Sequence, residues 1–235
     1  MNLRAAIVVA LSLLVGFGCA TPRTARDSGN YTLVFLKTGP EDARVTGDDR
    51  TKVFDGHMAN IQRLANERKL LVAGPFGKQR DNPSRRGLFV LDTADRAEAE
   101  QWASTDPAVK RGVFVLEYHD FATDAPLRAA LERVLASQAA AVEAGQAPDP
   151  KQTMRGYVLL TAEHGTVALP ELRVLSGHGH AFAPGALESI RAVAWLDAKD
   201  AADARLRYAE VLARIGKYEL DDWFGSVELA RTAAR

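Results

Sequence analysis

Residues 31–38 read YTLVFLKT, a run of β-branched and aromatic side chains that Gly39 and Pro40 end, and this pattern predicts a β-strand. Residues 53–69 follow with apolar side chains at helical spacing, and His57 lies on the apolar stripe of that helix. The pattern then predicts strands at 70–76 and 87–92, a helix at 94–104 and a strand at 112–121. The order βαββαβ predicts an α+β, ferredoxin-like unit.

The second half of the chain repeats this pattern in a shortened form, after an Ala- and Leu-rich helix predicted at 125–145. Tyr157-Val-Leu-Leu resembles Tyr31-Thr-Leu-Val, and Trp195-Leu-Asp resembles Val90-Leu-Asp. The last strand, predicted at 218–229, matches residues 113–121. Too few residues follow Tyr157 before the next strand for a counterpart of the first helix and its histidine. We therefore expect a degenerate second copy that acts as a scaffold.

Composition excludes several classes of function. The chain has 30 basic and 30 acidic side chains and no basic run longer than Arg85-Arg86, so we expect no nucleic-acid partner. Its single cysteine excludes a disulfide framework and a cysteine-based zinc site. No phosphate-binding loop and no nucleophile elbow occur, and no cofactor is indicated.

The first nineteen residues have the proportions of a secretory signal, with Arg4 before an apolar run at 5–15 that is too short for a mature membrane span. Cys19 follows Gly18 where cleavage is expected, which resembles a bacterial lipoprotein signal. The predicted regions are a signal at 1–19, a tether at 20–30, a first domain at 31–121, a helical linker at 122–153 and a second domain at 154–229.

A lipid on Cys19 would anchor the protein in the bacterial cell envelope facing the periplasm, in the outer membrane if the cell is Gram-negative. Gly16 departs from the aliphatic residue that the lipoprotein pattern has at that position. A plain signal cleaved after Gly16-Phe17-Gly18, with secretion to the periplasm, is therefore the alternative, and an uncleaved anchor is the third.

Five motifs together resemble the YciI-like (YCII-related) family over 31–121. They are His57, Lys69-Leu-Leu-Val-Ala-Gly-Pro75, Ala99-Glu-Gln-Trp-Ala103, Asp106-Pro107 and Gly112-Val-Phe114. The resemblance implies that His57 and Asp106 form the family's catalytic pair. If they do, we expect a substrate pocket beside His57, bounded by Gly74-Pro75 and the Asp106 turn. It also implies a link to muconolactone-isomerase-like barrels and a dehydrochlorinase activity in some members. Ala108 departs from the aromatic residue usual after Asp-Pro.

The same resemblance implies a dimer in which two four-stranded sheets pack into a barrel. A four-stranded sheet leaves one face uncovered unless another layer packs on it. In this chain the degenerate copy supplies that cover, so we expect an intrachain dimeric α+β barrel in a monomer.

His178 and His180 alternate along the chain, which places both rings on one face of a strand. With His164 or Glu188 as a third ligand they would bind a metal, whereas exposed loop histidines are the plainer interpretation, so no metal site is predicted. Trp102, Trp195 and Trp223 are interpreted as core or barrel-seam residues.

Two hypotheses for function follow. In the first, His57 acts as general acid or base and Asp106 orients it, for isomerase- or lyase-type proton transfer on a small organic molecule. In the second, the protein is a non-catalytic lipoprotein that binds a small ligand or an envelope partner, and His57 is simply packed in the core. The first is preferred, and whether the chain is an enzyme stays open at this point.

Overall fold

The computed structural model describes residues 29–123, 125–147, 153–162, 176–181 and 192–232, and for 176–181 it describes the backbone. The strands are β1 (Gly29–Thr38), β2 (Leu70–Arg80), β3 (Arg85–Leu91), β4 (Phe114–Thr123), β5 (Met154–Ala162), β6 (Ser176–Ala181), β7 (Ala192–Leu196) and β8 (Tyr218–Ser226). The helices are α1 (Gly47–Asn66), α2 (Arg96–Ala103), α3 (Pro107–Lys110), α4 (Leu127–Glu143), α6 (Ala201–Arg207), α7 (Ala209–Leu212) and α8 (Glu228–Thr232). The predicted signal with Cys19, most of the predicted tether, His164 and Glu188 lie outside the described residues.

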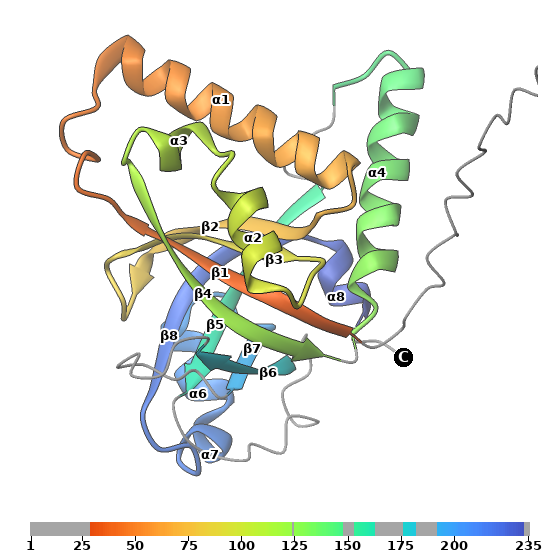
Figure 1. Cartoon of the computed structure of the whole chain (residues 1–235). Helices are drawn as coiled ribbons and strands as arrows, with labels where there is room; N and C mark the ends of the chain where they lie inside the picture. Colours follow the sequence, from red (N-terminus) through yellow and green to blue (C-terminus); the bar gives the residue numbers. More distant parts are fainter. Residues whose placement is uncertain (1–28, 124, 148–152, 163–175, 182–191, 233–235) are drawn as a thin grey trace, which may run out of the picture.

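In the part of the chain that the structure describes, eight strands form an antiparallel sheet that curls into a closed barrel. The strand order is β1-β3-β2-β8-β5-β7-β6-β4. The helices α1, α2 and α3 lie on one side of this barrel, α6 and α7 lie toward the opposite end, and α4 stands beside α8 (Figure 1). The molecule therefore has the mixed α+β architecture that the sequence predicts.

The two halves of the chain contribute strands in the same relative order. The first half supplies β4-β1-β3-β2 and the second supplies β8-β5-β7-β6, and the two sets meet at the β2–β8 and β4–β6 pairs. The registers correspond as well, because Leu33 lies opposite Val90 and Leu159 lies opposite Trp195. The sequence repeat aligns these same residues, Leu33 with Leu159 and Val90 with Trp195.

α1 is longer at its start than the helix predicted at 53–69, and it ends before Lys69. Asp48 and Asp49 lie in its first turn, where acidic side chains interact favourably with the positive end of the helix dipole. At the other end Arg68 has φ of 57°, a left-handed conformation that cannot continue the helix. The polar start carries no apolar periodicity, which is why the sequence pattern misses it.

The final strand predicted at 218–229 is wrong beyond Ser226, because the chain turns there into α8. The Ser226 hydroxyl accepts a hydrogen bond from the Glu228 backbone N–H. Glu228 also pairs with Arg133 of α4 at 2.6 Å, and Leu229 is buried among the side chains inside the barrel. The end of the chain therefore packs against α4 instead of lengthening the sheet.

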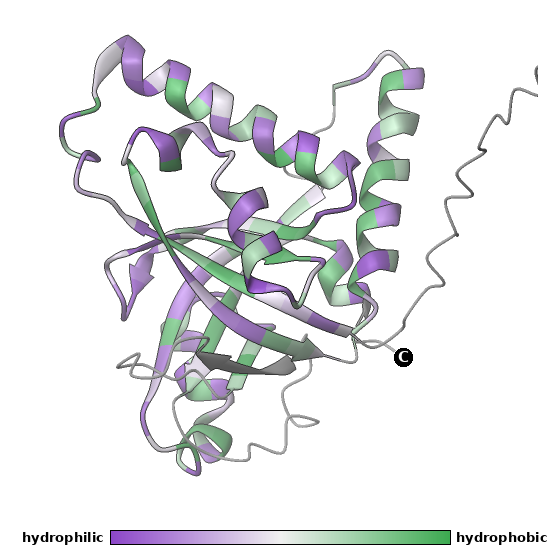
Figure 2. Ribbon diagram, in the orientation of Figure 1, coloured by the Kyte–Doolittle hydropathy of each residue, from purple (hydrophilic) through white to green (hydrophobic). Residues whose placement is uncertain are grey.

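The buried apolar side chains of the described residues form one cluster inside the barrel and two outside it. The strands carry most of the strongly hydrophobic residues, and α1 is largely hydrophilic (Figure 2). Phe35, Leu33 and Trp223 belong to the inner cluster, while an outer cluster under α1 includes Phe89 and Phe114. A second outer cluster lies under α6 and α7. Of the three tryptophans, Trp195 and Trp223 are fully buried inside the barrel, and Trp102 packs at the edge of the cluster under α1.

Candidate active site

α1 presents the predicted histidine on its buried face, under the helix and outside the barrel. His57 is 9% exposed, and its Nδ1 lies 2.6 Å from Oδ2 of Asp106. A carboxylate can only accept a hydrogen bond, so Nδ1–H donates to Asp106 and the neutral ring keeps its lone pair on Nε2. The structure thus brings together the two side chains that the sequence names as a pair, and Nε2 makes no hydrogen bond to any described residue.

Asp106 is held rigidly because it also caps a helix. It is the N-cap of α3 and fully buried; its Oδ1 accepts a hydrogen bond from the Ala108 N–H at 2.8 Å, and Pro107 occupies the first turn. Gly56 allows α1 to approach this turn, since a Cβ there would lie 3.0 Å from Cγ of Pro107. Asp106 therefore starts α3 with one carboxylate oxygen and contacts His57 with the other.

Aromatic rings surround the imidazole on several sides. The Phe89 ring stacks on His57 at 6.1 Å between centroids, and Phe54 and Phe114 meet it edge-on at 6.0 Å and 5.5 Å. Ala108, which departs from the family pattern, is fully buried in the same outer cluster. The imidazole consequently sits in a site of low polarity, where the Asp106 carboxylate interacts with it more strongly than in water.

One turn further along α1, Asn60 contacts the residue that precedes Asp106. Its Oδ1 accepts hydrogen bonds from Thr105 at 3.0 Å and from Arg63 at 2.8 Å. The buried Nδ2 has no hydrogen-bond partner within the described part of the chain. Because a guanidinium group can only donate, the atom facing Arg63 is the oxygen, and the amide N–H groups point elsewhere. This side chain is a second polar group beside the His57–Asp106 contact, and the sequence pattern did not single it out.

Comparison with known proteins gives the family. A model of the YCII-related domain matches residues 31–122, the region that holds both members of the His57–Asp106 contact. A protein of Haemophilus influenzae, named only as uncharacterized, is 32% identical over 89 residues, which are 36% of this chain and 87% of that protein. The chain belongs to the YCII-related family. Its YCII-related domain supplies β1 to β4, half of the strands of the barrel.

The predicted substrate-binding residues of the YCII-related domain lie on β2, at the junction with β8. The Gly74 carbonyl accepts a hydrogen bond from Nε1 of Trp223 at 3.0 Å, and a Cβ at Gly74 would lie 1.9 Å from the Phe224 carbonyl oxygen. Pro75 pairs with Gly87 of β3. Apart from its ladder partner Leu88 on β3, the described contacts of Gly74 are made with the second half of the barrel, and none is made with His57. A role of Gly74 and Pro75 in binding a substrate stays a prediction.

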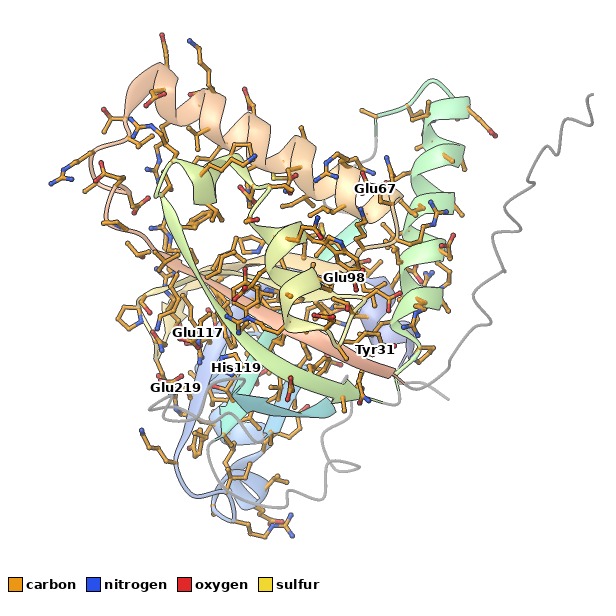
Figure 3. All side chains as sticks on the ribbon, viewed as in Figure 1. Tyr31, Glu67, Glu98, Glu117, His119 and Glu219 are labelled. Atoms are coloured by element: carbon orange, nitrogen blue, oxygen red, sulfur yellow. The ribbon has the colours of Figure 1, made fainter. Side chains whose placement is uncertain are left out.

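A second group of polar side chains, which we call the polar layer, lies inside the barrel at the end away from Tyr31. Figure 3 labels three of its members, Glu117, His119 and Glu219, together with Tyr31 near the opposite end. They form two networks that both contact the Phe35 ring, with the Arg85 guanidinium 4.3 Å from its centroid and the His119 ring edge-on at 5.6 Å between centroids. The polar layer consists of Lys37, Arg85, Glu117, His119, Thr161, Glu219 and Asp221.

The first network is a histidine–glutamate pair on β4. The His119 Nε2 lies 2.8 Å from Oε1 of Glu117, and Oε2 of Glu117 accepts from Lys37 Nζ at 2.9 Å. The hydrogen bond from His119 is the main reason that the pKa of the Glu117 carboxyl is lowered to about 2; burial opposes this shift and Lys37 adds to it. Glu117 is therefore ionised at neutral pH, and Nε2 of His119 is the nitrogen that donates.

The second network joins the two halves of the chain. Nη1 of Arg85 on β3 lies 2.6 Å from Oδ2 of Asp221 and 2.9 Å from Oε2 of Glu219, both on β8. It also donates to the Thr161 hydroxyl on β5 at 3.2 Å. Arg85 and Asp221 are almost completely buried, at 2% and 0% exposure. Removing either member of such a pair would leave the other as an uncompensated buried charge, which strongly destabilises a folded protein.

The sequence contained a signal for one of these networks and none for the other. Glu117, His119 and Phe121 alternate along β4, and Phe121 faces the inside of the barrel, so Glu117 and His119 share its face. Two charged or titratable residues on an inward face are unusual and could have been noticed. Arg85 and Asp221 are 136 residues apart, and no local pattern connects them.

No metal or membrane site is assigned. Among the residues that the structure describes, no group of three or more His, Cys, Asp or Glu side chains is arranged to hold a metal ion. His178 and His180 lie on β6, opposite Ala122 and Asp120, and their side chains are outside what is described. Within the described part of the chain, no helix is both long and apolar enough to cross a membrane.

Proposed function

We propose that the YCII-related domain catalyses proton transfer on a small organic molecule, as an isomerase or a lyase. His57 is the general acid or base, and Asp106 is the positioning residue that orients it. The 2.6 Å contact between the two buried side chains carries this proposal. The contact fixes the tautomer of the ring, so that Nε2 is available to take a proton.

In this reaction Nε2 of His57 takes a proton from a carbon of the substrate, and the electrons of the broken C–H bond form a new double bond. In an isomerase the proton returns at another carbon, and in a lyase a leaving group departs. The Asp106 carboxylate stabilises the imidazolium ion that forms, and the bond from the Ala108 N–H keeps that carboxylate in place. Phe54, Phe89 and Phe114 reduce the access of water to the ring.

Hydrogen exchange tests this proposal before the natural substrate is known. The full-length protein is incubated in D2O with a panel of small lactones and chlorinated carbon acids, and deuterium incorporation is followed by NMR. We expect His57→Gln to abolish any enzyme-dependent incorporation and Asp106→Asn to lower its rate by about 100-fold or more. Asparagine is also a good N-cap, so Asp106→Asn removes the carboxylate while preserving the cap of α3.

Glu117→Gln is the matched control, because it changes a second histidine–carboxylate pair elsewhere in the same domain. It should leave the incorporation rate unchanged. Incorporation by His57→Gln at the wild-type rate would rule the proposal out. Binding of a panel compound without exchange in any variant would favour the non-catalytic, ligand-binding alternative.

We also propose that residues 154–229 are a degenerate copy of the YCII-related domain, a ferredoxin-like unit, and that the chain is a monomeric pseudo-dimer. The equal strand order of the two halves and the corresponding pairs Leu33–Val90 and Leu159–Trp195 support this. Sedimentation equilibrium of the full chain should give the mass of one chain. A dimer that stays intact on dilution would count against the pseudo-dimer.

Finally, we propose that residues 1–19 are a lipoprotein signal and that a lipid on Cys19 anchors the protein to the cell envelope, facing the periplasm. The support is the pattern of the sequence, with an apolar run at 5–15 before the single cysteine. Intact mass spectrometry of the mature protein from a bacterial membrane fraction should show an N-terminal, lipid-modified Cys19. A mature chain that starts elsewhere without lipid would support the secreted alternative.

A further inference from the structure

The polar layer inside the barrel has a solvent-facing side and a buried side. Lys37 and Glu117 each have 28% of the side chain exposed, and Glu219 has 33%. Behind them, the side chains of Arg85 and His119 are only 3% and 2% exposed. A small molecule that enters past the first three side chains would therefore meet the last two. None of these residues belongs to the His57–Asp106 site.

The carboxylates that line this layer already have partners for most of their oxygens. Both oxygens of Glu117 accept, one from His119 and one from Lys37. Both oxygens of Asp221 accept as well, Oδ2 from Arg85 and Oδ1 from the backbone N–H of Asn82 at 3.1 Å. Glu219 contacts Arg85 through Oε2. Five of the six carboxylate oxygens of the polar layer are therefore engaged, which disfavours a cationic ligand.

The arginine, in contrast, keeps most of its donors. Its contacts with Asp221, Glu219 and Thr161 are all made by Nη1. The Nε–H and the two Nη2–H groups have no hydrogen bond to any described residue. These donors form the flat edge with which a guanidinium group binds a carboxylate through two parallel hydrogen bonds. Because the side chain is nearly buried and stacked on Phe35, that edge lies inside the barrel at low exposure.

The His119 ring meets the same Phe35 ring edge-on. Its Nδ1 is buried and has no hydrogen-bond partner among the residues that the structure describes. Nε2 donates to Glu117, so Nδ1 of the neutral ring is an acceptor. Leaving a buried polar atom unpaired is costly, and in folded proteins such atoms usually meet a partner such as water or a ligand. The acceptor thus points to a ligand group that donates a hydrogen bond.

We propose that the polar layer binds a small carboxylic acid that also carries a hydroxyl group. The ligand carboxylate lies on the free Nε–Nη2 edge of Arg85, and the ligand hydroxyl donates to Nδ1 of His119. The two side chains come from β3 and β4, and Arg85 is held in place by Asp221 from the second half of the chain. The site is therefore complete only when both halves form the barrel.

Three related compounds test this on the unmodified protein. Full-length protein is titrated with lactate, with propionate, which lacks the hydroxyl group, and with lactamide, which lacks the charge. Binding is read from the ring ¹⁵N signals of His119 in NMR spectra. We expect a saturable change with lactate, at least about tenfold weaker binding of propionate, and no binding of lactamide at the same concentrations. No saturable change with lactate at tens of millimolar, or equal binding of lactamide, would overturn the proposal.

Two variants locate the ligand. Arg85→Lys keeps the charge but removes the two-nitrogen edge, and it should weaken lactate binding by at least about tenfold. His119→Leu should remove the preference for lactate over propionate, which is read by calorimetry and requires no histidine signal. His57→Gln should change neither affinity, so failure of this proposal is distinct from failure of the proton-transfer proposal. Loss of lactate binding in His57→Gln would place the ligand at the other site and overturn the inference.

Discussion

β4 and β8 occupy corresponding places in the two halves of the barrel and fill them differently. Opposite Leu33 of β1, β4 carries His119; opposite Leu159 of β5, β8 carries Asp221. His119 pairs with a glutamate of its own strand, whereas Asp221 pairs with Arg85 from the other half of the chain. The difference shows that the histidine of β4 is paired within its own half, whereas the aspartate of β8 contributes a buried charge that binds the two halves together.

The largest expected effect is at the charge that joins the halves. Asp221→Ala leaves the Arg85 guanidinium buried with only the half-buried Glu219 as an anionic partner, so we expect a loss of about 3–5 kcal/mol in the free energy of unfolding. The measurement is urea denaturation at neutral pH. His119→Ala, at the corresponding place in β4, should cost less because it leaves no charge unpaired. A larger loss in His119→Ala would reverse the comparison.

The next effect concerns the junction of β2 and β8. A Cβ at Gly74 would lie 1.9 Å from the Phe224 carbonyl and 2.5 Å from the Trp223 ring, so Gly74→Ala forces the two strands apart. We expect a loss of about 1–3 kcal/mol, measured by the same denaturation. Gly156→Ala on β5 is the matched control, since the nearest atom to its Cβ would be 3.8 Å away. Equal stability of the two variants would show that the junction tolerates a side chain.

The smallest effect is the pH dependence that Glu117 contributes. Its pKa is about 2 in the folded protein and near 4.5 when unfolded, so its stabilising effect is present above pH 4.5 and is lost as the pH falls toward 2. After a reduction for its partial exposure, we expect this to amount to about 1–2 kcal/mol. In Glu117→Gln this contribution is absent, so the variant should lose less stability than the wild type between pH 4.5 and 2. Thermal unfolding across this pH range measures the difference.

Glu219→Gln is the control for this experiment, because Glu219 takes the corresponding place in β8. It should leave the contribution of Glu117 in place. If Glu117→Gln and wild type lose the same stability between pH 4.5 and 2, the hydrogen bond from His119 does not stabilise the ionised carboxyl in the way the geometry indicates.

The sequence predicted most of the elements and part of the site. The apolar stripe of the helix at 53–69 was sufficient to place His57 toward the sheet, and the structure confirms this. Asp106 came from resemblance to a family, since Asp before Pro indicates a turn and says nothing about contact with a residue earlier in the chain. The prediction that the last strand reaches Leu229 failed because Leu229 is as apolar as a strand residue but packs from a helix.

By itself the sequence determined the features that depend on neighbours along the chain. The alternation in β1, the periodicity of α1 and the Asp106-Pro107 helix start are local preferences of the backbone, set by a few adjacent side chains. Only the tertiary structure decided that Gly74 meets Trp223 and that Arg85 meets Asp221. Barrel closure brings together side chains from distant strands, and which of them meet is decided by register and packing over the whole sheet, which no local stretch of sequence specifies.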